Sequence, residues 1–240
     1  MASTVRERHN GLLDATLFGF NARLSLKDNS SELKALLKPS RYARTAAPLF
    51  ARMFNRPYPV IVDIGANAGV FSLLAASKMA SGRLVAIEPQ VSLFNRLEAH
   101  LGQLNPELGD RIDVHLFRCA VGPSSGNRTL SVPRQLGQAS LHTLPDADTI
   151  EVPVRPLFDI VSDVGAQRID ILKIDIEGFE DEVLIPYFES SSSEYWPEAI
   201  LLEHCHRARW QRDCETYLLE RGYSVESRGR TDMALIRSRA

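Results

Sequence analysis

Cysteine is scarce in this chain of 240 residues, and no apolar run approaches the roughly 20 residues that span a bilayer. The three cysteines, Cys119, Cys205 and Cys214, are odd in number and form no Cys-x-x-Cys pair. This pattern excludes a disulfide scaffold and argues against a structural zinc site. The N-terminal segment also lacks the apolar core of a signal peptide. These absences predict a soluble, cytoplasmic protein with reduced thiols and no membrane partner.

Neither sign of charge dominates, because 28 Lys and Arg stand against 30 Asp and Glu, for a net charge of −2. A general nucleic-acid binder gains its affinity from clustered positive charge, so no nucleic-acid partner is expected. With 44% hydrophobic and 24% charged residues, the chain is neither disordered nor fibrous. Only 5 of the basic residues are lysines, which makes Lys173, inside an apolar segment, conspicuous.

The first 56 residues predict a helical extension that caps the remainder of the same domain. One strand is expected inside it, because apolar and polar residues alternate over 20–26. A short helix is expected to end at Leu36, and a second one is expected over 42–54.

From residue 57 onward, apolar strands alternate with amphipathic helices. Strands are expected at 60–64, 83–88, 112–119, 169–176 and 199–203, followed by two final strands at 223–227 and 233–236. Such alternation predicts a parallel sheet covered by helices on both faces, with one strand antiparallel at the end. Residues 123–155, rich in Gly and Pro, interrupt the pattern and are expected to form an inserted loop or hairpin.

The segment Val62–Gly69 covers the end of the first predicted parallel strand and the turn after it. Gly65 and Gly69 allow a tight turn, but their spacing is not the Gly-x-Gly-x-x-Gly of dinucleotide binders. Asp63 would repel a pyrophosphate and suits a ligand with an ammonium group. Glu88 ends the next strand, 19 residues after Gly69, where a carboxylate can accept both ribose hydroxyls. Together these features predict a cationic nucleoside ligand, and S-adenosylmethionine fits.

Lys173, Asp175 and Glu177 recur at every second position of an apolar strand, which predicts that they share one face. Charges in a buried strand are costly unless they are paired, so one interpretation is a structural ion-pair set. The other places Asp175 at the end of the strand, opposite the transferable methyl, where it positions or deprotonates a hydroxyl. Glu203, which ends the next strand, is expected to join this cluster. Such a cluster can share a proton, orient a hydroxyl or bind a divalent cation such as Mg²⁺.

The chain resembles the FkbM-type S-adenosylmethionine-dependent methyltransferases from about Val60 to His204. The motifs that carry the resemblance are Val62–Gly69, Ala86–Pro89, Cys119–Gly122, Leu172–Glu180 and Leu201–Glu203. The resemblance implies a class I methyltransferase (Rossmann-like) α/β fold with seven mostly parallel strands, the last antiparallel. It also implies O-methylation of a small molecule, such as a sugar or a natural-product hydroxyl.

By position, the resemblance implies which residues contact S-adenosylmethionine. Asp63, Gly65 and Gly69 would line the methionine half, Glu88 would take the ribose, and Cys119 with Ala120 would border the adenine. The full expected set is Asp63, Gly65, Ala66, Asn67, Gly69, Glu88, Pro89, Cys119, Ala120 and Asp175. The expected catalytic set is Lys173, Asp175, Glu177 and Glu203, with no metal ligand assigned. The family's Glu-x-His motif reads Glu-His-Cys-His over 203–206, which leaves open which histidine corresponds.

Three other functions stay open on the sequence. An NAD(P)-dependent oxidoreductase would share the sheet, but the glycine motif that it needs is missing. An N- or RNA-directed methyltransferase would share the cofactor half and would need a basic surface. A non-catalytic nucleotide-binding protein would keep the fold without turnover.

A homodimer is compatible with the sequence. His142, in the insertion, is expected to be a solvated loop residue.

Overall fold

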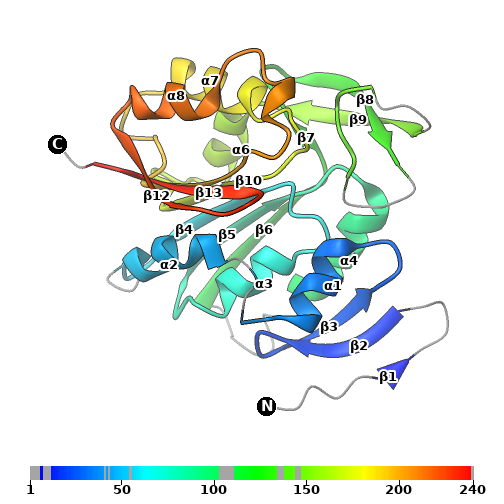
Figure 1. Cartoon of the computed structure of the whole chain (residues 1–240). Helices are drawn as coiled ribbons and strands as arrows, with labels where there is room; N and C mark the ends of the chain where they lie inside the picture. The colour runs from blue at the N-terminus through cyan, green and yellow to red at the C-terminus, as the bar shows by residue number, and fades with distance from the viewer. Residues whose placement is uncertain are drawn as a thin grey trace.

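A sheet of seven strands forms the centre of the molecule (Figure 1). Five neighbouring parallel strands are β4 (Val60–Ile64), β5 (Gly82–Ile87), β6 (Ile112–Phe117), β10 (Ile171–Ile174) and β11 (Ala199–Glu203). Two strands, β13 (Asp232–Arg237) and β12 (Tyr223–Arg228), extend the sheet, and β13 runs antiparallel to both of its neighbours. The strand order is β12-β13-β11-β10-β4-β5-β6. The predicted mostly parallel sheet with an antiparallel last strand is confirmed.

The computed structural model of the chain describes residues 6–7, 12–40, 42, 44–53, 56–102, 111–133, 138–143 and 147–238.

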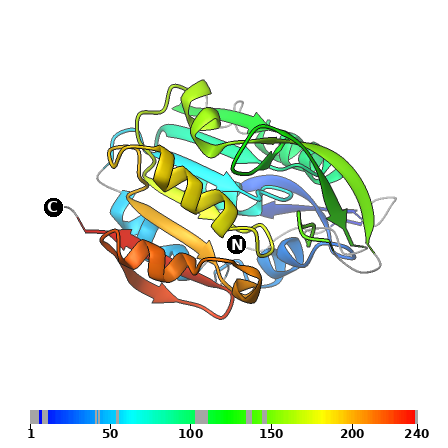
Figure 2. The same cartoon turned by 90° about the horizontal axis from the view of Figure 1, so that it is seen from above.

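Helices cover both faces of the sheet because its strands are apolar on both sides; every residue of β4 is buried. On one face lie α2 (Ala47–Met53), α3 (Val70–Ala76) and α4 (Val91–Leu101). On the other lie α6 (Leu157–Asp163), α7 (Asp181–Ser190) and α8 (Cys214–Leu219), which Figure 2 shows over the same side of the sheet. None of the described helices has the length and apolar character that a bilayer crossing needs.

The insertion predicted over 123–155 contains a hairpin. β8 (Gly126–Val132) pairs antiparallel with β9 (Asp148–Arg155), and β9 also pairs with the short strand β7 (Ala120–Val121). This confirms the predicted hairpin. Residues 134–137 and 144–146 of the insertion lie outside the described residues.

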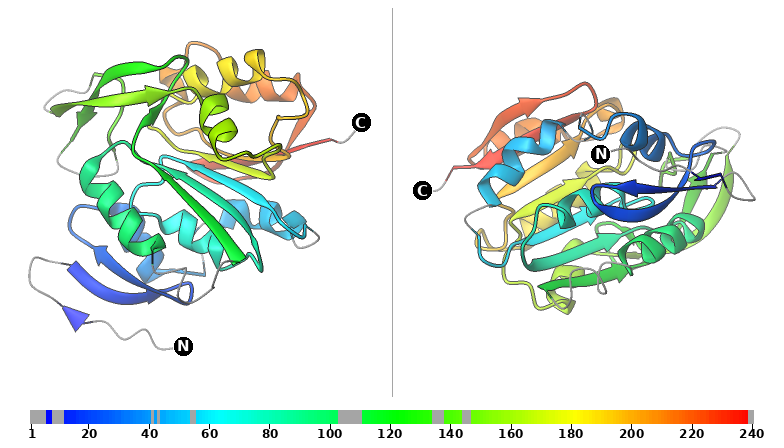
Figure 3. Two further views of the ribbon diagram at one scale, coloured as in Figure 1. Left: turned by 180° about the vertical axis from the view of Figure 1, so that it is seen from behind. Right: turned by 90° about the horizontal axis from the view of Figure 1, so that it is seen from below.

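The N-terminal extension differs from the predicted helical layer, because its first half is a small antiparallel sheet. β1 (Arg6–Glu7) pairs with β2 (Leu12–Leu17), and β2 pairs with β3 (Phe20–Ser25), the strand that the alternation predicted. Positive φ angles of 54° and 99° at Phe18 and Gly19 close the β2–β3 hairpin in two residues. Seen from below (Figure 3, right), this hairpin lies across α4. Sequence reasoning missed β2 because its alternation is short.

The helical half of the extension is α1 (Ser30–Leu37), followed by the 3₁₀ turn η1 (Arg44–Ala46) and α2. The Asn29 side chain accepts hydrogen bonds from the backbone N–H of residues 31 and 32, which caps α1. The predicted helix over 42–54 is therefore wrong in its first part, and its predicted end at Phe54 lies outside the described residues. Pro48 lies in the first turn of α2, where the missing N–H costs nothing.

The backbone just after β4 lies very close to the backbone just after β10. Gly65 has a φ of 70°, and a Cβ at this position would lie 1.9 Å from the backbone oxygen of Asp175. Glycine is therefore required here both by conformation and by space.

We expect Gly65→Ala to lower the free energy of unfolding by about 3 kcal/mol, because the added methyl group forces the two strands apart. Gly165 is a matched control: its φ is 62°, but nothing lies within 4 Å of an added Cβ. Gly165→Ala should therefore cost only the conformational strain of about 1 kcal/mol. Urea unfolding of both variants measures the difference, and equal losses would contradict the close approach at Gly65.

Candidate active site

A cavity of about 720 Å³ opens where β4, β5, β10 and β11 end at their carboxyl termini. Ligands of open α/β sheets bind at this edge, and small-molecule sites have volumes of roughly 300–1,000 Å³. The cavity is lined on one side by the strand ends and β7, and on the other by α1, η1 and the turn between β12 and β13.

Lys173 is a buried cation at the centre of this edge. Its Nζ donates to the backbone oxygen of Gly65 at 2.6 Å and lies 3.2 Å from Asp63 Oδ1. The second carboxylate near it belongs to Asp175, with Oδ2 at 3.8 Å. Burial by itself lowers the pKa of Lys173, but the charges of Asp63 and Asp175 outweigh it and raise the pKa above its ordinary value. Lys173 is therefore a permanent cation that links β4 to β10.

Asp63 does not lie where the sequence argument expected it. Its side chain is fully buried and accepts a hydrogen bond from Ser72 Oγ at 2.6 Å, in addition to its ion pair with Lys173. It does not line the cavity. In this structure the carboxylate neutralises an internal ammonium group, that of Lys173, so it supports the site from behind.

The turn after β4 presents Gly65, Ala66 and Asn67 to the cavity. The backbone N–H groups of Gly65 and Ala66 donate to the Ile87 oxygen, which fixes the turn against β5. Asn67 has a φ of 55°, a conformation that is uncommon for any residue but Gly. Gly69 does not line the cavity: a Cβ there would lie 2.7 Å from Leu97 Cδ1, so this glycine allows α3 to pack on α4.

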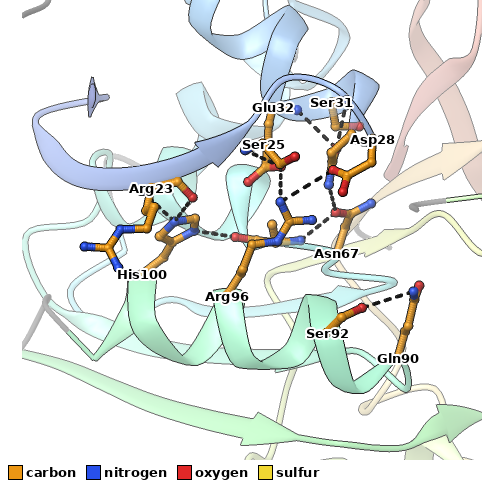
Figure 4. Close-up of polar contacts among 12 residues, drawn as sticks. Arg23, Ser25, Asp28, Ser31, Glu32, Asn67, Gln90, Ser92, Arg96 and His100 are labelled. Atoms are coloured by element: carbon orange, nitrogen blue, oxygen red, sulfur yellow. Dashed lines mark hydrogen bonds and ion pairs between the residues drawn. The ribbon is translucent and has the colours of Figure 1, made fainter. Parts of the chain in front are cut away.

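A hydrogen bond from the N-terminal extension holds this turn in place (Figure 4). Asn29 Nδ2 donates to Asn67 Oδ1 at 2.5 Å, and the same Oδ1 accepts the N–H of Ala68 at 2.7 Å. On the far side of the turn, His100 Nδ1 lies 2.6 Å from the Ala68 oxygen. Its Nε2 contacts the backbone of Arg23 in β3. The N-terminal extension is thus part of the site.

Glu32 and Arg96 form a second link between α1 and α4, also shown in Figure 4. Glu32 is fully buried, and its Oε2 lies 2.8 Å from Arg96 Nη1. Burial raises the pKa of Glu32 to about 7 although the nearby guanidinium lowers it. This pair anchors the helix that covers one side of the cavity.

Glu88 follows β5 and lines the cavity together with Pro89, Cys119 and Ala120. The Glu88 carboxylate is 5% exposed and accepts the N–H groups of Asn67 and Gln90, each at 2.9 Å. Burial raises its pKa to about 7, against the lowering effect of these two hydrogen bonds.

Three carboxyl groups meet at the other end of the cavity. One oxygen from each of Asp175, Glu177 and Glu203 lies within 4.8 Å of the others. The sequence predicted this grouping, but for a reason that the structure does not support. β10 ends at Ile174, so Asp175 and Glu177 belong to the following loop, and Glu177 has a φ of 59°.

This loop is shaped by Glu180, which the sequence argument did not single out. Its Oε1 accepts the N–H groups of Ile176 and Gly178, and its Oε2 accepts Trp210 Nε1 at 2.7 Å. Arg209 Nη1 donates to the backbone oxygen of Glu177 at 2.8 Å. The loop that carries Asp175 and Glu177 is therefore held by Glu180, which caps the start of α7 (Asp181–Ser190), and by the segment after β11.

Burial and mutual repulsion favour the protonated form of two of the three carboxyl groups. Burial raises the pKa of Glu203 to about 10, with further increases from the charges of Asp175 and Glu177. Burial raises the pKa of Glu177 to about 8, with contributions from Asp175 and Glu180. The cluster therefore carries less negative charge than three carboxylates would in water.

His206 is the histidine that joins the cluster. Its Nε2 lies 2.8 Å from Glu177 Oε2, and burial, followed by the charge of Arg209, lowers its pKa. His204 Nε2 is buried without a hydrogen-bond partner in the described part of the chain. Of the two histidines in the Glu-His-Cys-His segment, His206 is therefore the one that contacts the carboxyl cluster.

One cavity residue was missed from the sequence, and one residue beside the carboxyl cluster was misjudged. Tyr42, from the N-terminal extension, lines the cavity beside Lys173. His142 was expected to be solvated, but it is half-buried. Its Nε2 lies 2.8 Å from the Gly178 oxygen, and its ring packs edge-on against Phe179. No local pattern marks either residue, because each reaches the site from a segment far away in the chain.

Comparison with solved structures confirms the fold class. The methyltransferase domain of human METTL16 superposes with a TM-score of 0.50 at 16% identity, covering 98% of this chain and 86% of that one. The fold is that of a class I methyltransferase. The family model of the Methyltransferase FkbM domain matches residues 63–225. The chain therefore belongs to this family of S-adenosylmethionine-dependent methyltransferases.

Individual relatives agree with this assignment. Methyltransferase 1 of Beauveria bassiana is 25% identical over 223 residues, which cover 78% of this chain and 86% of that protein. The 31-O-demethyl-FK506 methyltransferase FkbM of Streptomyces tacrolimicus is 28% identical, over 54% of this chain and 59% of that protein. A segment of the AMB antimetabolite synthetase AmbE of Pseudomonas aeruginosa is 30% identical, over 54% of this chain and only 8% of that synthetase. The magnesium ion that the acidic cluster suggested receives no support from these comparisons.

The raised carboxyl pKa values predict how stability depends on pH. Glu177 and Glu203 bind protons more tightly in the folded protein than at their ordinary pKa of 4.5 in the unfolded chain. Their contribution is therefore complete below that value and is lost as pH rises through about 8 and about 10. We expect the free energy of unfolding to fall between about pH 5 and about pH 9, and Glu203→Gln to flatten this decline because the amide needs no proton.

Urea unfolding at several pH values measures this dependence. Glu98→Gln is the matched control, because Glu98 is exposed on α4 and lies outside the cavity. A decline as steep in Glu203→Gln as in the wild type would show that Glu203 does not hold a proton in the folded protein.

Proposed function

We propose that this methyltransferase transfers a methyl group to a hydroxyl oxygen of a small organic molecule. The observation that carries the proposal is the carboxyl cluster of Asp175, Glu177 and Glu203 beside Lys173, at the cavity end away from Glu88. A hydroxyl acceptor must lose a proton during transfer, and a carboxylate within hydrogen-bond reach can take it. The printed name of the Streptomyces tacrolimicus relative also describes transfer to an oxygen.

The cofactor half of the cavity fits S-adenosylmethionine. Glu88 offers a buried carboxylate whose oxygens keep lone pairs free for ribose hydroxyls after accepting two backbone N–H groups. Cys119 and Ala120 border an apolar end suited to a flat ring. Gly65, Ala66 and Asn67 line the wall between Glu88 and Lys173, on the path from the ribose to the carboxyl cluster. When bound, the cofactor supplies an electrophilic methyl group on a sulfonium.

In the proposed mechanism, the protein aligns the acceptor and removes one proton from its hydroxyl group. Asp175 accepts the hydrogen bond of the acceptor hydroxyl and takes its proton as the new bond forms. Lys173, 3.8 Å from Asp175 Oδ2, holds this carboxylate in place and stabilises its negative charge. Glu177 and Glu203 keep their protons at neutral pH, so they donate hydrogen bonds and do not compete as bases. Alignment of the acceptor in the closed cavity contributes the remaining rate enhancement.

We expect Glu88→Ala to remove the contact with the ribose. S-adenosylhomocysteine, the product form of the cofactor, should bind about tenfold more weakly, because a hydrogen-bond acceptor for the ribose hydroxyls is lost. A ribose-deoxygenated analogue of S-adenosylhomocysteine should lose much less affinity. Calorimetric titration of both ligands measures the difference, with Glu98→Ala as a control on an exposed glutamate. If the two ligands weaken equally, Glu88 only supports the fold.

We expect Asp175→Asn to bind S-adenosylhomocysteine as the wild type does but to lose turnover by about a hundredfold or more, because the amide cannot accept the proton. Asp148→Asn, on an exposed residue of β9, serves as the control. Release of S-adenosylhomocysteine with a panel of sugars, phenols and other alcohols measures turnover, and mass spectrometry locates the new methyl group. Full activity of Asp175→Asn contradicts its role, and a methyl group on nitrogen contradicts the hydroxyl acceptor.

A further inference from the structure

Four cationic side chains line the cavity without a carboxylate partner among the described residues. They are Lys34, Lys38, Arg44 and Arg230, all exposed and all lining the cavity. Within the described part of the chain, none of them makes an ion pair or a side-chain hydrogen bond. Most described arginines elsewhere are paired, as Arg96 is with Glu32 and Arg212 is with Glu189. We call these four residues the cationic rim.

The rim is assembled from three segments that the fold brings together. Lys34 and Lys38 lie one turn apart at the end of α1. Arg44 and Arg230 flank a close contact between η1 and the turn after β12, where Ser227 Oγ donates to the Thr45 oxygen at 2.7 Å. A Cβ on Gly229 would lie 2.5 Å from Thr45 Oγ1. Residues almost 190 positions apart in the sequence therefore place two guanidinium groups at one side of the cavity mouth.

Local helix chemistry does not account for this set. Basic residues near the end of a helix are favourable, which explains one lysine of α1. A second lysine four residues away is a like-charge neighbour and is unfavourable in a free helix. Neither argument applies to Arg44 or Arg230. Lysine is also rare in the chain, yet three of its five lysines, at positions 34, 38 and 173, line this one cavity.

The carboxyl groups that face the rim do not neutralise it. Lys173 balances only one of its two carboxylate neighbours, Asp63 and Asp175. Thr231 gives Asp232 a hydrogen bond but no positive charge. The four rim cations therefore outnumber the two carboxylates that are left without a cation. Glu177 and Glu203 are held mostly neutral by burial and by the charges near them, as described above. The mouth of the cavity therefore attracts anions.

On this basis we propose that the methyl acceptor carries an anionic group, a carboxylate or a phosphate, and that the cationic rim binds it. The hydroxyl then points inward to Asp175 while the anion stays at the mouth, next to Lys34, Lys38, Arg44 and Arg230. This inference rests on the proposed function, because it describes the acceptor of the same reaction. It narrows the acceptor class to acidic small molecules, such as hydroxy acids, acidic sugars or phosphorylated alcohols.

Three phenols of similar size test the proposal as probes. They are para-hydroxybenzoate, its neutral methyl ester, and hydroquinone monophosphate. Each probe is titrated calorimetrically into the protein saturated with S-adenosylhomocysteine. Whichever of the two anions binds more tightly should bind about tenfold more tightly than the ester, as expected for a charge-assisted contact. The ratio between the two anions decides between a carboxylate and a phosphate. Added salt should weaken both anions and leave the ester unchanged.

Charge-reversal variants test whether the residues of the cationic rim bind the anionic group. In Lys34→Glu/Lys38→Glu and in Arg44→Glu/Arg230→Glu, the preference for the anion over the ester should fall about tenfold. Lys78→Glu makes the same kind of charge change on an exposed lysine outside the cavity and should keep the preference. Binding of S-adenosylhomocysteine, unchanged in every variant, shows that the fold and the cofactor half are intact.

Equal affinities for anion and ester, a preference that survives both charge reversals, or no binding of either anion would overturn the proposal. Failure of the proposed function is distinguishable from these outcomes. It appears as a methyl group found on nitrogen, or as hydroxyl acceptors left unmodified by a protein that binds the cofactor. If methyl ethers form only from neutral alcohols, the proposed transfer to a hydroxyl stands, but the proposal of an anionic acceptor is overturned.

Discussion

The carboxyl edge of the sheet depends on one buried ammonium group, that of Lys173. It lies opposite Asp63 in the register of β10 and β4, and its Nζ contacts Asp63 and the Gly65 oxygen. Taking a charge out of water is costly, so the pair is maintained only because each partner is satisfied by the other and by further hydrogen bonds. Without Lys173, Asp63 would be a buried carboxylate with only Ser72 as a partner. The turn toward the cofactor and the position of Asp175 both follow from this link.

Two turns with positive φ angles carry the groups on either side of Lys173. Asn67 and Glu177 are both non-glycine residues in a conformation that costs energy locally. Each is held by contacts from elsewhere: Asn29 donates to the side chain of Asn67, and Ser140 and Arg209 donate to the backbone oxygen of Glu177. The site is thus shaped by the N-terminal extension, the β8–β9 insertion and the segment after β11. These three parts of the chain also line the cavity.

Several elements could be predicted from the sequence because they depend on local pattern. The buried strands appear as apolar runs, and the strand-turn-helix around Gly65 follows from its glycines and from the acidic residue after the next strand. The prediction of the carboxyl cluster was right about which residues gather, but wrong about the backbone structure that brings them together. Lys173, Asp175 and Glu177 do gather, but β10 ends at Ile174, and the loop is closed by the carboxylate of Glu180. Asp63 was assigned to the ligand because its partner, Lys173, lies 110 residues away in the chain.

The sequence by itself determined the α/β class, the order of the strands along the chain, the family and the residues around which the site is built. Periodicity and short motifs encode these features, and both act over a few neighbouring residues. The tertiary structure alone decided that Asp63 faces inward and that His206 meets Glu177. It also decided that Tyr42 reaches the cavity and that Arg44 and Arg230 line the same cavity. Each of these depends on packing between segments far apart in the chain, where burial and charge pairing set the direction of a side chain and no local pattern records it.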